Sequence, residues 1–128
     1  FLSKNNYLIH TDAVKNYVLP QSNYTKNTEW LAYADEADLL NVALFGCTAK
    51  AWREANPTLA KNSNIRDYAS IAELTVLSNL ETHNAELIKS RMEKKERFEA
   101  LRQIAQYQLR VLAEAEKIKE LPTLEDKS

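Results

Sequence analysis

The chain has 128 residues, 45% of them hydrophobic, which suits one domain built around one core. Charged residues make up 27% but nearly cancel, to a formal net charge of -1, which argues against a protein coated with nucleic acid or held on a membrane surface. One Gly and three Pro are too few for the turns of a sheet-rich fold, so the composition predicts helices.

Residues 3–19 form the first predicted helix, because they carry apolar side chains at helical spacing and Pro20 stops a helix. Thr11 is also a good N-cap, so a shorter helix could instead begin there after an extended start. The polar residues 21–28 predict a loop.

Residues 34–45 form the most hydrophobic predicted helix, with apolar side chains nearly all round its axis, and we expect it at the centre of the core. Asp35, Glu36 and Asp38 crowd the expected first turn. Three carboxylates could bind a divalent metal. We favour the simpler interpretation, in which they complement the positive end of the helix dipole.

Gly46 follows this helix and suits a helix end, because Gly adopts the left-handed conformation at little cost. Thr48 then caps a short predicted helix, 49–55. Two helices joined by a tight turn are the outline of a helix-turn-helix, with Lys50 and Arg53 as possible nucleic-acid contacts. Any two packed helices can be joined this way, so the motif is weak.

Ser70 and Glu73 make a capping box that opens a helix to about residue 91. Glu81 and Asn84 fall in the middle of its apolar face.

A buried carboxylate needs a cation or several hydrogen-bond donors. We therefore expect a buried polar network of Arg66, Glu81, Asn84 and Arg53, in which Glu81 pairs with Arg66 or Arg53.

The last predicted helix, about 95–121, carries an apolar stripe from Phe98 to Ile118. At about 27 residues it is roughly 40 Å long, more than a domain of this size can cover, so its far half packs on another chain, on a module outside this chain, or on water. We favour a homodimer through this helix, because DNA-binding proteins often act as dimers; contact with the absent module is the alternative. A basic run precedes and overlaps its start, and offers a second set of possible nucleic-acid contacts: Lys89, Arg91, Lys94, Lys95 and Arg97. Residues 122–128 are expected to form a flexible tail.

No catalytic, cofactor-binding or metal-binding set is predicted. The chain has no Gly-rich phosphate loop, no paired-Cys zinc spacing and no His-Glu-x-x-His. His10 and His83 stand alone, and each is expected to be a surface or hydrogen-bonded histidine. Cys47 is the single Cys, so no disulfide can form within the chain, nothing suggests an oxidising compartment, and we expect a small buried side chain.

No apolar run is long enough to span a bilayer, and the start at Phe1 has no signal-peptide layout. We expect a cytoplasmic bacterial protein without membrane contact, of which this chain is an excised or trimmed fragment.

Two stretches of sequence carry a family resemblance: residues 6–15, NYLIHTDAVK, and residues 33–57, from YADEADLLNVALFG to Asn56-Pro57. Together with Asn64–Ala69, Asn79–Glu81 and Asn84-Ala85, they are similar to the C-terminal region of bacterial KilA-N domain proteins, over about residues 1–112. The KilA-N module itself, associated with DNA binding, is not in this chain. The resemblance implies a domain beside that module in a DNA-associated, phage-derived protein.

We therefore expect an all-α protein: a compact bundle of about five helices, with one domain over residues 1–121 and a long amphipathic last helix. Its expected role is non-enzymatic, an interaction or assembly domain whose partners are the KilA-N module, DNA through that module, and a second copy. One alternative is direct nucleic-acid binding, through the pair of helices at 34–55 or the basic run at 89–97. Another is a metal-dependent hydrolase built on Asp35, Glu36, Asp38 and Glu81.

Overall fold

The computed structural model describes the backbone of residues 2–120 and the side chains of residues 4–117. This part of the chain contains no strand and folds into five α-helices: α1 (Leu2–Ala13), α2 (Glu29–Phe45), α3 (Ala49–Ala55), α4 (Ile71–Lys89) and α5 (Lys94–Glu120). The expected all-α architecture with a long last helix is confirmed. The expected tail at 122–128 lies outside the described residues. None of the described helices is long and apolar enough to cross a membrane.

The first helical segment extends beyond α1. After α1 the chain continues as a π-helical turn, Val14–Val18, and then as a 3-10 turn, Leu19–Gln21, which contains Pro20. The helical path therefore ends near Pro20 as expected. The alternative start at Thr11 is wrong, because Thr11 lies inside α1 and its hydroxyl donates to the Leu8 carbonyl at 3.1 Å.

α2 begins at Glu29, five residues earlier than expected. The sequence signal for this start is weak, because Thr28 makes no side-chain capping bond to the helix. The Thr28 hydroxyl instead accepts a hydrogen bond from the backbone N–H of Thr25 at 2.8 Å. Asp35, Glu36 and Asp38 therefore lie in the interior of α2, and the interpretation that they complement a helix terminus is also wrong.

The local signals for the other helix ends are confirmed. Gly46 ends α2 in the left-handed conformation, with φ 81°. The Thr48 hydroxyl accepts from the backbone N–H of Ala51 at 3.0 Å and starts α3 at the expected residue. Ser70 and Glu73 form the reciprocal capping box at the start of α4.

α4 lies at the centre of the fold, a place that the sequence had suggested for residues 34–45. It packs against α1 and α5 and also contacts α2. Its Val76 and Leu80 side chains are fully buried. One apolar cluster joins α2, α4 and α5, and a second joins α1, its π-helical turn, α2 and α4.

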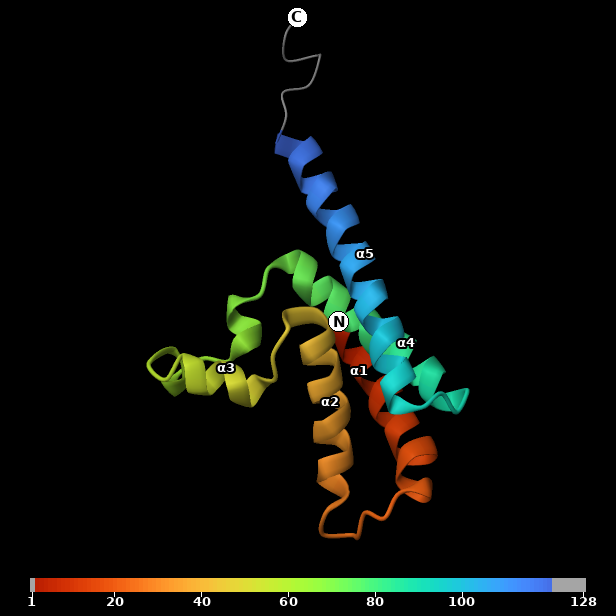
Figure 1. Ribbon diagram of the computed structural model, residues 1–128. Coiled ribbons are helices and arrows are strands. Elements are labelled where there is room, and N and C mark those ends of the chain that lie inside the picture. The colour runs from red at the N-terminus through yellow and green to blue at the C-terminus, as the bar shows by residue number, and fades with distance from the viewer. Residues whose placement is uncertain (1, 121–128) are drawn as a thin grey trace, which may run out of the picture.

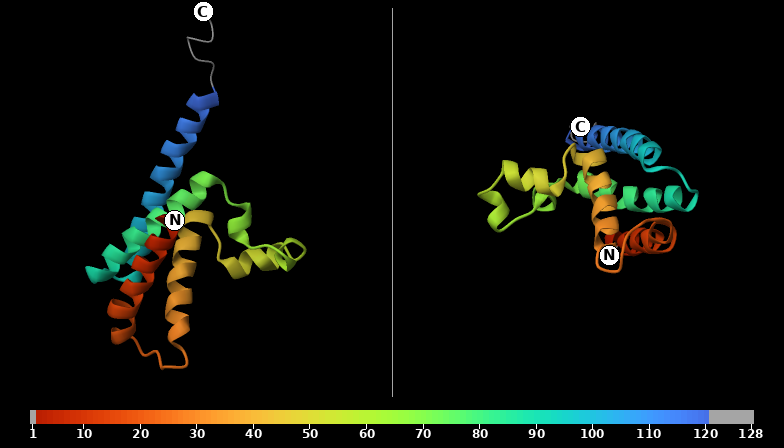
Figure 2. Two further views of the ribbon diagram at one scale, coloured as in Figure 1. Left: turned by 180° about the vertical axis from the view of Figure 1, so that it is seen from behind. Right: turned by 60° about the horizontal axis from the view of Figure 1, so that its bottom comes forward.

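Two parts of the protein extend outwards from this body (Figure 1). The first is an arm, residues 47–69, made of α3 and the 3-10 turns Leu59–Lys61 and Ile65–Tyr68; both views of Figure 2 show it projecting from the long helices. Within the arm, the rings of Trp52 and Tyr68 pack with their centres 5.7 Å apart. The second is the C-terminal half of α5, which extends beyond every other helix.

Candidate functional site

A buried polar network joins four helices at the centre of the protein. His10 lies on α1, Glu36 on α2, Asn84 on α4 and Arg97 on the first turn of α5, and none is more than 5% exposed. The Arg97 guanidinium forms a two-point ion pair with Glu36, with Nη1–Oε1 at 2.5 Å and Nη2–Oε2 at 3.0 Å. Arg97 Nε also donates to the Met92 carbonyl at 3.1 Å. Two parallel hydrogen bonds make this a strong form of charge pairing.

Asn84 connects the other members of the network. Its amide nitrogen donates to Glu36 Oε1 and lies 2.9 Å from both that atom and His10 Nε2. Its amide oxygen accepts from Arg97 Nη1, also at 2.9 Å. Rotating the amide would turn its oxygen towards a carboxylate, so the neighbours fix its orientation. Because an amide nitrogen can only donate, His10 Nε2 is the acceptor and the ring proton lies on Nδ1.

The charge states of the network follow from burial and hydrogen bonding. Burial alone would raise the pKa of Glu36, but hydrogen bonds from Arg97 and Asn84 outweigh it and hold this pKa below its usual value. Burial lowers the pKa of His10 to about 4, against the attraction of Glu36. At neutral pH the network therefore contains one carboxylate, one guanidinium and one neutral imidazole.

This network is suited to holding helices together rather than to catalysis. On α4, Asn84 follows Leu80 of one apolar cluster and precedes Ile88 of the other, so the polar groups lie between the two clusters. Glu36 and Asn84 are at most 3% exposed, and His10 borders a hollow of about 70 Å³, which is smaller than small-molecule sites usually are. The network is therefore a clamp between the two halves of the core.

The clamp was missed in the sequence, although a signal for it exists. Arg97 lies one helical turn before Leu101 and two turns before Ala105, and both of these side chains are buried. Its place on the apolar stripe predicts burial. Assigning Arg97 as a nucleic-acid contact was wrong, because its guanidinium is enclosed and paired with Glu36.

The expected network of Arg66, Glu81, Asn84 and Arg53 does not form as one unit. Glu81 and Asn84 are buried as expected, but Asn84 belongs to the clamp. Arg53 is exposed on α3. Arg66 approaches Glu81, yet no ion pair within 4.0 Å joins Glu81 to any described residue.

Glu81 and Arg66 instead face the same hollow, which we call the Glu81 cavity. It has a volume of about 300 Å³ and lies between α1, α4 and the 3-10 turn Ile65–Tyr68. The residues that line it are Lys4, Tyr7, Arg66, Leu74, Leu77, Ser78 and Glu81. A smaller hollow of about 70 Å³ adjoins it and shares Tyr7, Arg66 and Glu81.

The acidic residues proposed for a metal site do not converge. The Asp35 carboxylate accepts a hydrogen bond from the Tyr24 hydroxyl at 2.9 Å, while Glu36 is enclosed in the clamp. Asp38 lies at a surface hollow beside Lys94. Within residues 4–117 no three His, Cys, Asp or Glu side chains are placed to hold a metal ion, so the four acidic residues of the hydrolase alternative are not brought together.

The remaining basic candidates divide into two separate sets. Lys50 and Arg53 are exposed on α3, in the arm. The other set is exposed at the end of α4 and the start of α5: Lys89, Arg91, Lys94 and Lys95. Figure 1 and the left view of Figure 2 place the arm and the α4–α5 turn on opposite sides of the body, so the two sets do not form one basic surface.

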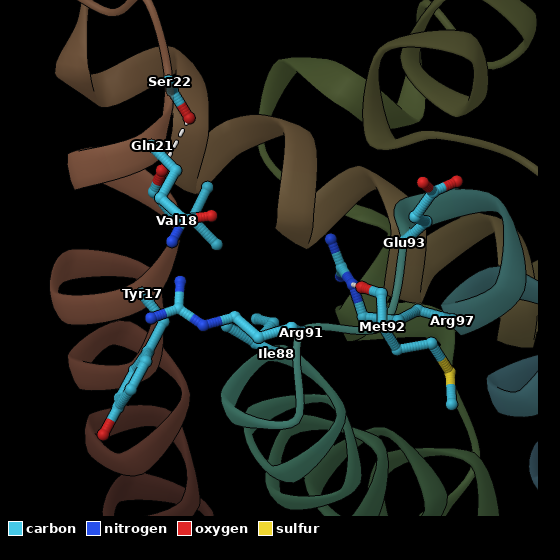
Figure 3. A pocket seen from close by; sticks show the side chains of 9 residues that line it. All are labelled: Tyr17, Val18, Gln21, Ser22, Ile88, Arg91, Met92, Glu93 and Arg97. Atoms are coloured by element: carbon cyan, nitrogen blue, oxygen red, sulfur yellow. Dashed lines mark hydrogen bonds between the residues drawn. The ribbon is translucent and has the colours of Figure 1, made fainter.

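A second hollow, of about 250 Å³, separates the π-helical turn from the α4–α5 turn (Figure 3). The Arg91 guanidinium carbon lies 5.6 Å from the centre of the Tyr17 ring, a cation–π contact. Arg91 also has a positive φ of 65°, which turns the chain sharply between the two helices. Arg97 and Glu93 line the opposite wall, so this hollow presents charges of both signs.

No protein-family model, curated protein or solved structure matches the chain.

Proposed function

We propose that this chain is a non-enzymatic helical interaction or assembly domain that accompanies a DNA-binding KilA-N module in a phage-derived or bacterial protein. The proposed partners are that module, DNA through the module, and a second copy of this chain. The KilA-N part rests on the resemblance of residues 6–15 and 33–57.

The interaction part of the proposal is carried by the C-terminal half of α5. The end of this half extends beyond the other helices (Figure 1), and residues 113–117 are exposed all round, whereas Leu109 and Leu112 still pack against the core. Tyr107 and Val111 are 60% and 44% exposed and lie one turn apart on the same face. Isolated helices of this length are marginal in water, because most helical stability comes from packing. A partner that covers Tyr107 and Val111 would supply that packing.

A homodimer through this face is the form of assembly that we propose. DNA-binding proteins often match two-fold symmetric sites with two-fold symmetric protein dimers. Analytical ultracentrifugation of this chain at roughly tens of micromolar, where even a modest dimer is populated, tests it. Sedimentation as a dimer supports the proposal, whereas a monomer contradicts a stable dimer and leaves the KilA-N module as the partner to be tested by mixing.

Direct nucleic-acid binding is the second candidate. One observation favours it: Lys50 and Arg53 are exposed on α3, which follows α2 through the Gly46 turn and projects from the body. The near-zero net charge opposes it. Titration of duplex DNA at two salt concentrations separates the candidates, because binding through phosphate contacts weakens steeply as salt rises. Lys50→Gln and Arg53→Gln would reduce such binding, while Lys95→Gln would reduce it only if the α4–α5 turn is the contact.

A further inference from the structure

The Glu81 cavity contains two opposite charges that face one space without meeting. Glu81 comes from the middle of α4 and Arg66 from the 3-10 turn before it. Both also line the smaller hollow beside it. The distance between their charged atoms exceeds the 4.0 Å of an ion pair. A gap of this kind between a cation and an anion can be filled by a group that is complementary to both.

The Glu81 carboxylate is incompletely satisfied. Its side chain is only 5% exposed, and no described residue donates a hydrogen bond to it. Burial raises its pKa to about 6, although Arg66 acts in the opposite direction. The Glu81 oxygens are not among the fully enclosed, unpartnered side-chain atoms of the described residues, so they open to the cavity. A carboxylate that is largely removed from water and has no protein donor gains from a donor supplied by a ligand.

The other polar groups that border the cavity make no hydrogen bond to Glu81. The Ser78 hydroxyl accepts a hydrogen bond from the amide nitrogen of Asn6 at 2.8 Å. Lys4 and Arg66, the two cations of the lining, are exposed, and Lys4 forms no ion pair with a described residue. His10, which borders the smaller hollow, is neutral at neutral pH and is bonded to Asn84.

The remaining wall is apolar. Leu74 and Leu77 project from α4 and Tyr7 from α1, and Tyr7 is more than half exposed. A volume of about 300 Å³ is at the lower end of the range for small-molecule sites. The cavity thus combines a buried anion, exposed cations and an aliphatic surface.

We infer that the Glu81 cavity binds a small zwitterion, an α-amino acid with an aliphatic side chain. The ligand ammonium donates to the Glu81 carboxylate and replaces the missing donors. Its carboxylate accepts from Arg66 and Lys4, and its side chain covers Leu74 and Leu77. The bound ligand then lies between the Glu81 carboxylate and the Arg66 guanidinium and contacts both. This inference goes beyond the proposed interaction function and does not depend on it.

Three probes that share one carbon skeleton test the inference on the whole chain. L-leucine carries both charged groups, 3-methylbutan-1-amine lacks the carboxylate, and 4-methylpentanoate lacks the amine. Binding is measured by calorimetry and by amide chemical shifts at neutral pH. We expect L-leucine to bind about tenfold or more tightly than either analogue, which corresponds to roughly 1.4 kcal/mol.

Variants assign the two contacts. Glu81→Gln should weaken L-leucine binding by about tenfold or more, and Arg66→Gln should reduce the preference for L-leucine over the amine, with Lys4 as the remaining cation. Glu99→Gln makes the same chemical change at an exposed site on α5 and should leave binding unchanged. The inference is overturned if L-leucine produces no signal up to roughly 10 mM, a very weak affinity. Equal binding of all three probes, or undiminished binding by Glu81→Gln, overturns it as well.

Discussion

Glu36 and Arg97 lie 61 residues apart in the sequence but form a buried two-point ion pair that fastens α2 to α5. Removing two charges from water costs several kcal/mol for each, and only good geometry with further hydrogen bonds offsets this. Asn84 and the Met92 carbonyl provide those bonds. The pair is therefore well matched, and the loss of one partner should be far more harmful than the loss of both.

Arg97→Met leaves the Glu36 carboxylate buried without its cation. We expect the free energy of unfolding to fall by roughly 3–5 kcal/mol, measured by urea denaturation followed by circular dichroism. The double variant Glu36→Leu/Arg97→Met should recover much of this loss. Arg102→Met, at an exposed position of α5, is the matched control and should change stability by less than about 0.5 kcal/mol. An Arg97→Met protein as stable as the control contradicts the clamp.

The helix ends that were predicted well depend on neighbouring residues only. Gly46, Thr48 and the Ser70–Glu73 pair act on backbone groups within a few residues, so their chemistry can be read from the sequence. The start of α2 was not predicted, because its N-cap position has no capping bond. That helix gains its first turns from packing, where Ala32 is buried against the second apolar cluster.

The clamp depends on which helices face each other, and this is not a local property. Burial of Asn84 and Glu81 followed from their place on the apolar face of α4. Their partners did not follow, because His10, Glu36 and Arg97 lie on three other helices. Arg66 was correctly placed near Glu81, but the cavity between them arises from the packing of α1 against α4.

Leu40 tests the core assignment of α2. Its side chain is 2% exposed and belongs to the cluster shared with α4 and α5. Leu40→Ala should lower the free energy of unfolding by roughly 2–5 kcal/mol, because a cavity remains where the side chain was. Leu59→Ala removes the same atoms at a 42% exposed position in the arm and should cost much less. Similar losses for both variants would show that the two sites are equally packed.

The contribution of Glu81 to the stability of the protein should fall as pH rises, whereas acid denaturation lowers stability as pH falls. The pKa of Glu81 is raised by burial from 4.5 to about 6 in the folded protein. The folded state therefore holds a proton more tightly, and the contribution of this group to stability is lost as pH rises from about 4.5 through about 6. Glu81→Gln should stabilise the protein above this window and have little effect below it. Urea midpoints across the window measure this, and a variant destabilised at neutral pH would refute it.

Titration of His10 should change the free energy of unfolding with pH in the direction opposite to that of Glu81. Its pKa is lowered from 6.5 to about 4, so only the unfolded chain gains a proton between these values, and stability falls as pH falls through this range. Glu81 opposes this trend in part of the range, so the comparison is best made in the Glu81→Gln protein. There, His10→Gln should flatten the dependence of unfolding free energy on pH, while His83→Gln should not. An unchanged slope in the His10 variant contradicts the neutral, buried imidazole.

The proposed dimer makes a prediction about one face of α5. Tyr107 and Val111 are 60% and 44% exposed, so charges placed at these two positions should not disturb the fold. Burying side chains of this kind contributes roughly 1.5–3 kcal/mol each. Tyr107→Lys/Val111→Lys should therefore raise the dimer dissociation constant by at least about a hundredfold.

Gln106→Lys adds a charge about 100° away around the helix axis and is the control. The Tyr107 face is the interface if the double variant sediments as a monomer while Gln106→Lys sediments as a dimer. The urea midpoints of both variants should be unchanged, which shows that the fold is intact. If both variants dissociate equally, added charge alone is responsible and the interface lies elsewhere on α5.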